Sequence, residues 1–176
     1  MDKSFKLKVK TDKKSLTQTS GNFTIQPLDR GYGITLGNAM RRVLLTSIPG
    51  AAITHVKIEG VDHEFSSIKG VKDDVADIIM NLKKVRFKLM DNNPDKVNLS
   101  LKGKKIVTAQ DIQSASDQFE ILNKDQYITE INTSGKIEME LRIGIGKGYV
   151  PSEENELPNL TVGTLSIDSI FNPVTK

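Results

Sequence analysis

Three glycines are the first residues whose spacing could do chemistry. They follow the pattern Gly31-x-Gly33-x-x-x-Gly37 between a possible strand and a helix, the order in which a nucleotide-binding fold holds phosphates. The spacing is one residue longer than the dinucleotide-binding pattern, and no G-x-x-x-x-G-K-[ST] pattern occurs in the chain. We therefore interpret the glycines as a tight entry into the helix, and nucleotide binding by residues 31–37 is the alternative function.

Histidine and carboxylate spacing suggests two further sites, and we expect neither. His55, Glu59 and His63 are spaced by four, which would align metal ligands on a helix, but the surrounding sequence alternates as a strand. His63 and Glu64 precede Ser66 and Ser67, as a base and nucleophile could, without an oxyanion-hole motif or a nucleophile elbow. We predict no catalytic residue, no metal and no cofactor.

Composition indicates an ordinary soluble protein. The 176 residues are 37% hydrophobic and 27% charged, and 25 Lys and Arg against 22 Asp and Glu give a net charge of +3. The sequence has no Cys, its first residues lack the apolar core of a secretory signal, and no apolar run reaches membrane-spanning length. These features predict a cytoplasmic location without a membrane partner.

Hydrophobic periodicity predicts an α+β fold. Alternation predicts a strand hairpin around Leu7, Val9 and Phe23, each strand with one buried face. Helical spacing predicts a first helix that Pro49-Gly50 ends, and a second helix over 70–85 that begins with Asp73 and Asp74. Further strands are predicted at 51–60, 85–90, 96–101, 119–123, 127–131, 136–146 and 165–171, and a polar loop at 151–159.

The first helix has two contrasting faces. One arc is apolar and is predicted to pack inward; it consists of Leu36, Ala39, Met40, Val43 and Leu44. The opposite face places one leucine between two arginines; it consists of Asn38, Arg41, Arg42 and Leu45. Spacing alone leaves two interpretations of this second face open, a solvated surface with one apolar residue or a contact patch for another protein.

The sequence resembles the amino-terminal domain of the alpha subunit of bacterial and plastid RNA polymerase. The resemblance rests on "PLDRGYGITLGNAMRRVLLTSIPG", on "GKGYVP" and on "VGTLSIDSIFNPV", and it covers nearly the whole chain. The family pattern reads "ERGxGxTLGNALRRxLLxSxPG", so Asp29 and Met40 are conservative departures.

The resemblance implies a two-part architecture. A dimerisation subdomain begins with residues 1–50, a sheet-rich insert subdomain spans 51–171, and residues 172–176 begin the return to the dimerisation subdomain, whose remaining strands and long helix follow in the family. The implied function is a non-catalytic assembly scaffold in transcription. In that role a second alpha subunit pairs with the chain, and the pair docks the beta and beta-prime subunits of DNA-directed RNA polymerase, a nucleotidyltransferase complex. Direct promoter DNA contact is not expected of this segment, and the implied location is the bacterial cytoplasm, at the nucleoid through the polymerase, or a plastid.

The resemblance also assigns residues to contacts. It places the beta-subunit contact at Arg42 and Leu45, with Asn38 and Arg41 as neighbours. It places the beta-prime or assembly contact at Lys83, Ile167 and Asp168. Dimerisation falls to the apolar arc, Leu36, Ala39, Met40, Val43 and Leu44.

A nucleic-acid-binding module remains a further alternative. It is suggested by lysines near the amino terminus, Lys3, Lys6, Lys8, Lys10, Lys13 and Lys14.

Overall fold

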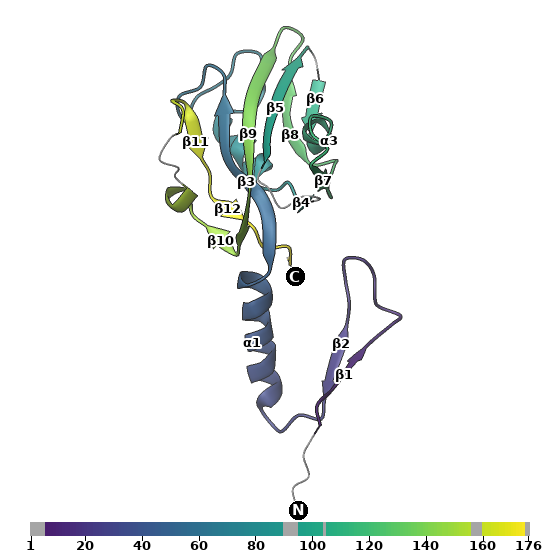
Figure 1. Cartoon of the computed structure of the whole chain (residues 1–176). Coiled ribbons are helices and arrows are strands. Elements are labelled where there is room, and N and C mark those ends of the chain that lie inside the picture. Colours follow the sequence, from purple (N-terminus) through teal and green to yellow (C-terminus); the bar gives the residue numbers. More distant parts are fainter. Residues whose placement is uncertain (1–5, 90–94, 104, 156–159, 175–176) are drawn as a thin grey trace, which may run out of the picture. The chain divides into compact units, whose positions relative to one another are not determined.

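A computed structural model describes residues 6–89, 95–103, 105–155 and 160–174, and Figure 1 shows its helices and strands. The elements confirm a mixed fold and are, in chain order, β1 (Lys8–Thr11), β2 (Phe23–Gln26), α1 (Tyr32–Thr46), β3 (Pro49–Ile58), α2 (Val75–Leu82), β4 (Phe87–Leu89), β5 (Asp95–Lys102), β6 (Lys105–Thr108), α3 (Ala109–Gln113), β7 (Phe119–Ile121), β8 (Tyr127–Ile131), β9 (Lys136–Lys147), β10 (Tyr149–Val150), η1 (Ser152–Asn155), β11 (Thr164–Ser166) and β12 (Ser169–Ile170). The chain divides into two compact units, Met1–Val43 and Leu44–Lys176, and each is described by itself.

The first unit begins with the predicted hairpin. β1 and β2 pair antiparallel from Lys8 opposite Gln26 to Thr11 opposite Phe23. The prediction that each strand buries one face is wrong, because Leu7, Val9 and Phe23 are all exposed. Two strands alone present too little surface to cover their own apolar side chains.

Helix α1 forms where the glycine run and Pro49 predict it. Gly31 has a φ of 92°, a left-handed conformation that favours glycine, and the Tyr32 amide donates to the Asp29 carbonyl at 3.1 Å. The chain turns there, and the helix begins at Tyr32 and ends at Thr46. Pro49 then opens strand β3.

The second unit is built on a four-stranded antiparallel sheet in the order β11-β3-β9-β5. Inward-facing residues of β9 alternate with outward ones and lie in the core; they are Ile137, Met139, Leu141 and Ile143. Helix α2 belongs to the same core and buries Val75, Ile78, Ile79 and Leu82. The helical spacing that predicts the second helix is confirmed at these four positions.

The second helix is shorter than predicted at its amino-terminal end. Gly70 has a φ of 82°, and its carbonyl accepts a hydrogen bond from the Asn132 amide at 2.8 Å. Val71 forms an isolated bridge with Ile131. These bonds hold residues 70–74 against the β8–β9 turn, so the helix begins only at Val75.

Strand β6, helix α3 and strand β10 were not predicted from the periodicity. Strand β6 pairs with β8, and α3 follows it directly after a capping box between Thr108 and Asp111. In Figure 1, α3 lies beside β6 and β7.

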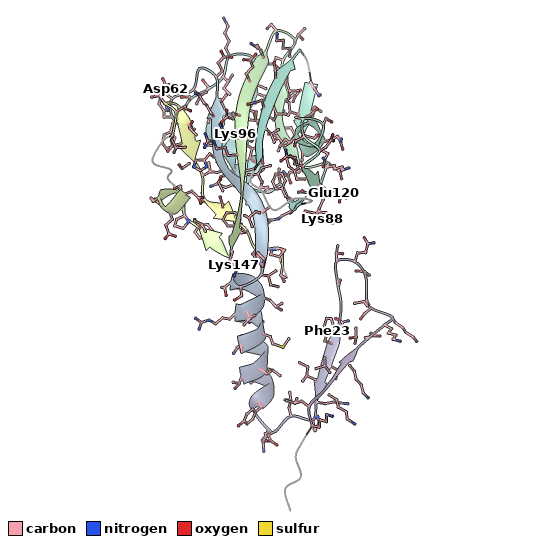
Figure 2. The ribbon with its side chains drawn as sticks, in the orientation of Figure 1. Phe23, Asp62, Lys88, Lys96, Glu120 and Lys147 are labelled. Atoms are coloured by element: carbon pink, nitrogen blue, oxygen red, sulfur yellow. The ribbon has the colours of Figure 1, made fainter. Side chains whose placement is uncertain are left out.

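On the neighbouring β4–β7 pair, Lys88 and Glu120 form an exposed ion pair at 3.3 Å, and Figure 2 labels both. The predicted loop 151–159 begins as the single helical turn η1, and its last four residues lie outside the described residues.

Asp73 ties the start of the second helix to strand β8. Its Oδ2 accepts hydrogen bonds from the Tyr127 hydroxyl at 2.5 Å and from Thr129 Oγ1 at 2.9 Å. Burial opposes ionisation of Asp73, but these hydrogen bonds outweigh it and lower the pKa of Asp73. Burial and the Asp73 carboxylate together raise the pKa of Tyr127 to about 12. Asp73 was predicted as a helix-start residue; it lies before the helix instead, and Asp74 takes the N-cap position.

Glycines in β3 and β9 let the segment that follows β12 pack closely against the sheet. A side chain at Gly50 would place its Cβ 1.8 Å from the Phe171 carbonyl oxygen, and one at Gly146 would lie 2.6 Å from the Phe171 ring. A third glycine, Gly144, leaves room for the Thr54 methyl group, which its Cβ would meet at 2.7 Å. The buried Phe171 can therefore lie directly on the β3–β9 backbone.

We expect Gly50→Ala to destabilise the second unit by about 2 kcal/mol, because the added methyl group must displace backbone rather than a flexible side chain. Urea unfolding measures this. Gly37→Ala is the control, since its methyl group meets no atom within 4 Å. Equal stability of the Gly50 variant and the parent would contradict the close packing of the Phe171 backbone on Gly50.

We expect Asp73→Asn to lower the free energy of unfolding near neutral pH by about 1.5 kcal/mol, because two hydrogen bonds to a charged acceptor are weakened. The folded-state pKa of Asp73 is depressed, so this contribution is present above the unfolded pKa of about 3.9 and is lost as the pH falls through the folded pKa. Urea unfolding over a pH series measures both effects. Asp74→Asn is the matched control, because the Asp74 side chain makes no capping hydrogen bond. A difference between Asp73→Asn and the parent that stays constant into acid would refute the electrostatic explanation.

Candidate functional site

The arginine-framed face of α1 is the first candidate site. All four predicted residues, Asn38, Arg41, Arg42 and Leu45, lie on α1 and are exposed. Leu45 stands one helical turn after Arg41, and its side chain is 39% exposed. A large apolar side chain between guanidinium groups matches the composition of protein interface cores.

The apolar arc of α1 is the second candidate. The prediction that this arc packs inward is wrong for the described chain, because no residue of α1 is buried. Met40 is 42% exposed, Val43 57% and Leu44 38%, while Ala39 is also exposed and Leu36 is half-buried. An amphipathic pattern shows which side is apolar, but it does not show which residues cover that side. The arc is an uncovered apolar stripe of the kind that marks an association surface.

The end of α2 and the segment between β11 and β12 form the third candidate. Lys83, the C-cap of α2, donates a hydrogen bond from Nζ to the Asp168 carboxylate, and both side chains are half-buried. Burial opposes ionisation of Asp168, but the Lys83 ammonium and the Tyr149 hydroxyl outweigh it and lower the pKa of Asp168. Ile167 is 3% exposed, and its amide donates to the Thr54 carbonyl at 2.9 Å. The structure thus brings the three predicted residues together, with the charged pair at the surface and Ile167 in the core below.

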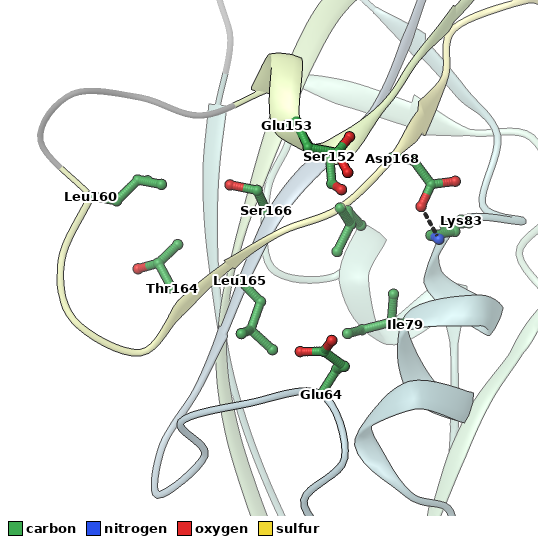
Figure 3. Close-up of a pocket in the computed structure, with 11 residues that line it drawn as sticks. Glu64, Ile79, Lys83, Ser152, Glu153, Leu160, Thr164, Leu165, Ser166 and Asp168 are labelled. Carbon is green, nitrogen blue, oxygen red and sulfur yellow. Dashed lines mark hydrogen bonds and ion pairs between the residues drawn. The ribbon is translucent and has the colours of Figure 1, made fainter.

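A cavity of about 480 Å³ lies beside this ion pair (Figure 3). One side is formed by Ser152 and Glu153 of η1, the other by Ile79 of α2 and by Glu64, and β11 with the residues after it runs between them. Glu64 and Glu153 form no ion pair with any residue in the described ranges. With Asp168 neutralised by Lys83, the cavity is net negative.

Sequence reasoning missed Glu64, Glu153 and Tyr149 as part of this site. They come from a loop, a single helical turn and a two-residue strand, so no periodicity marks them. No short-range motif links Glu64 to the segment around Asp168, which lies about a hundred residues further along the chain.

The glycine run does not form a phosphate cradle. Gly33 and Gly37 lie within α1, whereas a phosphate loop places its glycines before the helix. A Cβ at either position would meet open space, so neither marks a close backbone approach. The alternative of nucleotide binding by residues 31–37 is not supported.

His55, Glu59 and His63, the three residues spaced by four, do not align on a helix. His55 is 3% exposed on β3; its Nδ1 lies 2.9 Å from Thr54 Oγ1, and its Nε2 has no hydrogen-bond partner in the described part of the chain. Burial is the main cause that lowers the pKa of His55, and the nearby Arg142 charge adds to it. Glu59 is exposed and lies near Lys136 and Glu138. Within the described ranges, no three His, Cys, Asp or Glu side chains gather as a metal would require.

The His63 and Ser66 side chains do meet, at 3.2 Å between Nδ1 and Oγ. Both residues belong to an exposed turn that the Ser66 amide closes on the His63 carbonyl at 3.2 Å. The contact therefore has a structural explanation as part of this turn. The lysines of the further alternative are exposed around β1, except Lys3, which lies outside the described residues. No helix in the described ranges is long and apolar enough to span a membrane.

Comparison with known proteins identifies the family. A family model described as the RNA polymerase Rpb3/RpoA insert domain matches residues 56–172. A protein of Prosthecochloris aestuarii named DNA-directed RNA polymerase subunit alpha is 49% identical over 167 residues, 95% of this chain and 51% of that protein. The chain belongs to the RNA polymerase alpha-subunit family.

Two other alpha subunits agree with this assignment. Those of Alkaliphilus oremlandii and Chlorobaculum tepidum are both 50% identical, over 97% and 95% of this chain. The match covers 54% and 51% of their own lengths, so the chain spans about half the length of the curated relatives it matches. The resemblance seen in the sequence is confirmed.

We expect Lys83→Met to raise the pKa of Asp168, because burial then acts on that carboxyl without its main counter-charge. Carboxyl carbon NMR titration measures this. Lys84→Met is the control, since Lys84 Nζ bonds to Asn81 Oδ1 at 3.2 Å instead. An unchanged Asp168 titration would show that the ion pair does not form in solution.

Proposed function

We propose that the chain is a non-catalytic assembly scaffold of DNA-directed RNA polymerase. Two copies pair, and the pair docks the beta and beta-prime subunits, which carry out nucleotidyl transfer. The observation that carries the proposal is that α1 has no buried residue yet presents an apolar arc and an arginine-framed leucine. A helix of this kind gains its stability from tertiary contacts, and we assign contacts on these two faces to other chains.

The proposed organisation has three parts. Residues 1–50 begin the dimerisation subdomain, residues 51–171 form the insert subdomain, and residues 172–176 begin the return to the first. The insert proposal is supported by the family match over 56–172 and by the contiguous core of the second unit. The location follows from the role: the bacterial cytoplasm, at the nucleoid through the polymerase, or a plastid.

Each contact is assigned to a different surface. Dimerisation uses the arc of Leu36, Ala39, Met40, Val43 and Leu44. The beta subunit contacts Arg42 and Leu45, with Asn38 and Arg41 beside them. The beta-prime subunit contacts Lys83 and Asp168, while the buried Ile167 holds the segment between β11 and β12 that carries Asp168.

We expect Arg42→Ala to weaken capture of the beta subunit by about 2 kcal/mol or more, because arginines at the centre of interfaces are frequent hot spots. The chain's own fold should change little, since Arg42 is exposed. Co-expression with both large subunits followed by size-exclusion chromatography measures assembly, and circular dichroism of the isolated chain measures folding.

The control for this experiment is Lys124→Ala, which removes an exposed basic side chain on a turn of the second unit. This control should assemble like the parent. Equal capture of the beta subunit by the Arg42 variant would refute the assigned contact. Failure of the parent chain to assemble with either large subunit would refute the scaffold function.

A further inference from the structure

Strand β11 is an edge strand, and among the described residues no strand pairs with its outer edge. Within that part of the chain it pairs with β3 alone, with Leu165 opposite Val56 and Ser166 opposite His55. The Ile167 amide donates to the Thr54 carbonyl, and backbone bonding alternates along an antiparallel pair. Leu165 therefore bonds toward β3, and the amide and carbonyl of Ser166 point to the opposite edge. In the described ranges no hydrogen bond is found for these two groups of Ser166.

The open edge faces the cavity beside the Lys83–Asp168 pair. Thr164, Leu165 and Ser166 all line that cavity, together with the two residues that follow them. Figure 3 shows the strand crossing between η1 on one side and α2 with Glu64 on the other. A second strand laid along β11 would alternate its side chains between these two sides.

The lining on both sides suits an extended segment with basic side chains. Glu64 and Glu153 give each side a carboxylate that forms no ion pair with a described residue. Next to Glu64, Ile79 and Leu165 offer apolar surface for the methylene stem of a lysine or arginine. Phe65, which follows Glu64, is 82% exposed, and Val162, which precedes this strand, is 92% exposed. Neither residue lines the cavity, but each lies within two positions of a residue that does.

We infer that the outer edge of β11 receives an added β-strand from the partner, an extended basic segment whose main chain pairs with Ser166 and whose lysine or arginine reaches Glu64. This rests on the proposed function, since the partner is the large subunit that docks at Lys83 and Asp168. Main-chain hydrogen bonds provide the attachment, and the alternating side chains provide the choice of segment.

Residue-resolved hydrogen exchange tests the pairing directly. In the free chain the Leu165 amide is protected by β3 and the Ser166 amide exchanges fast; in the assembled polymerase both are protected. If the Ser166 amide still exchanges fast in an assembly that the chain enters normally, the added strand is refuted while the scaffold function stands. Protection of Ser166 in the free chain that grows with its concentration would identify a second copy as the occupant, which also overturns the inference.

Substitutions test the chemistry of the edge. Ser166→Pro removes the outward amide, and proline is tolerated at an outward-facing edge position. We expect it to weaken capture of that large subunit about tenfold, because a partner carbonyl loses its donor. Ser166→Ala keeps the amide and should capture normally. Glu64→Gln should weaken capture and reduce its salt dependence, whereas Glu120→Gln, at the β4–β7 surface, should do neither. Equal capture by Ser166→Pro and Ser166→Ala would exclude main-chain pairing, and equal capture by Glu64→Gln and the parent would exclude the basic side chain.

Discussion

The antiparallel pairing of β3 with β9 is the constraint on which the second unit depends. The two strands run together from Pro49 opposite Lys147 to Ile58 opposite Met139, with one irregularity between Ile53 and His55. On one face this pairing presents the alternating apolar residues of β9 to the core. Along its other edge β3 pairs with β11. Because residues of β11 line the cavity, the position of the cavity follows from the register of β3. A shift by one residue would turn Val56 and Leu141 out of the core, which makes other registers unfavourable.

Side-chain hydrogen bonds hold the segment after β11 to strand β3 and to η1. Ser169 is buried, and its hydroxyl donates to the Ile53 carbonyl at 2.9 Å, beside the irregularity in β3. Asn155 Nδ2 donates to the Ile167 carbonyl at 2.8 Å and thereby ties η1 to the same segment. Leaving such buried groups without partners costs more free energy than each bond contributes net, so these bonds select one path for the chain. Along that path Phe171 packs on Gly50 and Gly146, and Asp168 lies opposite Lys83.

Helices and strands were predicted well where turn-forming residues and hydrophobic periodicity indicate the same element. Gly31 and Pro49 bracket α1, and the alternation of 136–146 predicts β9, because each signal is local. The start of α2 was predicted too early, because Val71 and Gly70 are taken up by contacts with residues about sixty positions away. The family resemblance alone assigned Lys83 and Asp168 to one contact, since no periodicity connects residues so far apart, and their ion pair was not predicted. The uncovered state of the α1 arc could not be predicted from its pattern either, because that pattern describes one helix and not its neighbours.

The two kinds of proposed docking surface differ in how well the chain prepares them. On α1 the side chains provide the contacts, and long arginine and leucine side chains lose conformational freedom when a partner orders them. At β11 the contact groups are peptide groups already held by β3 on the other side of the strand, so little further ordering of this chain is required. Side-chain surfaces such as α1 tolerate substitution at the rim and depend on a few residues at the centre. A strand edge instead depends on the orientation of its backbone amide and carbonyl groups, which most substitutions leave intact. Its selectivity must therefore come from the acidic and apolar groups beside it, Glu64, Glu153 and Ile79.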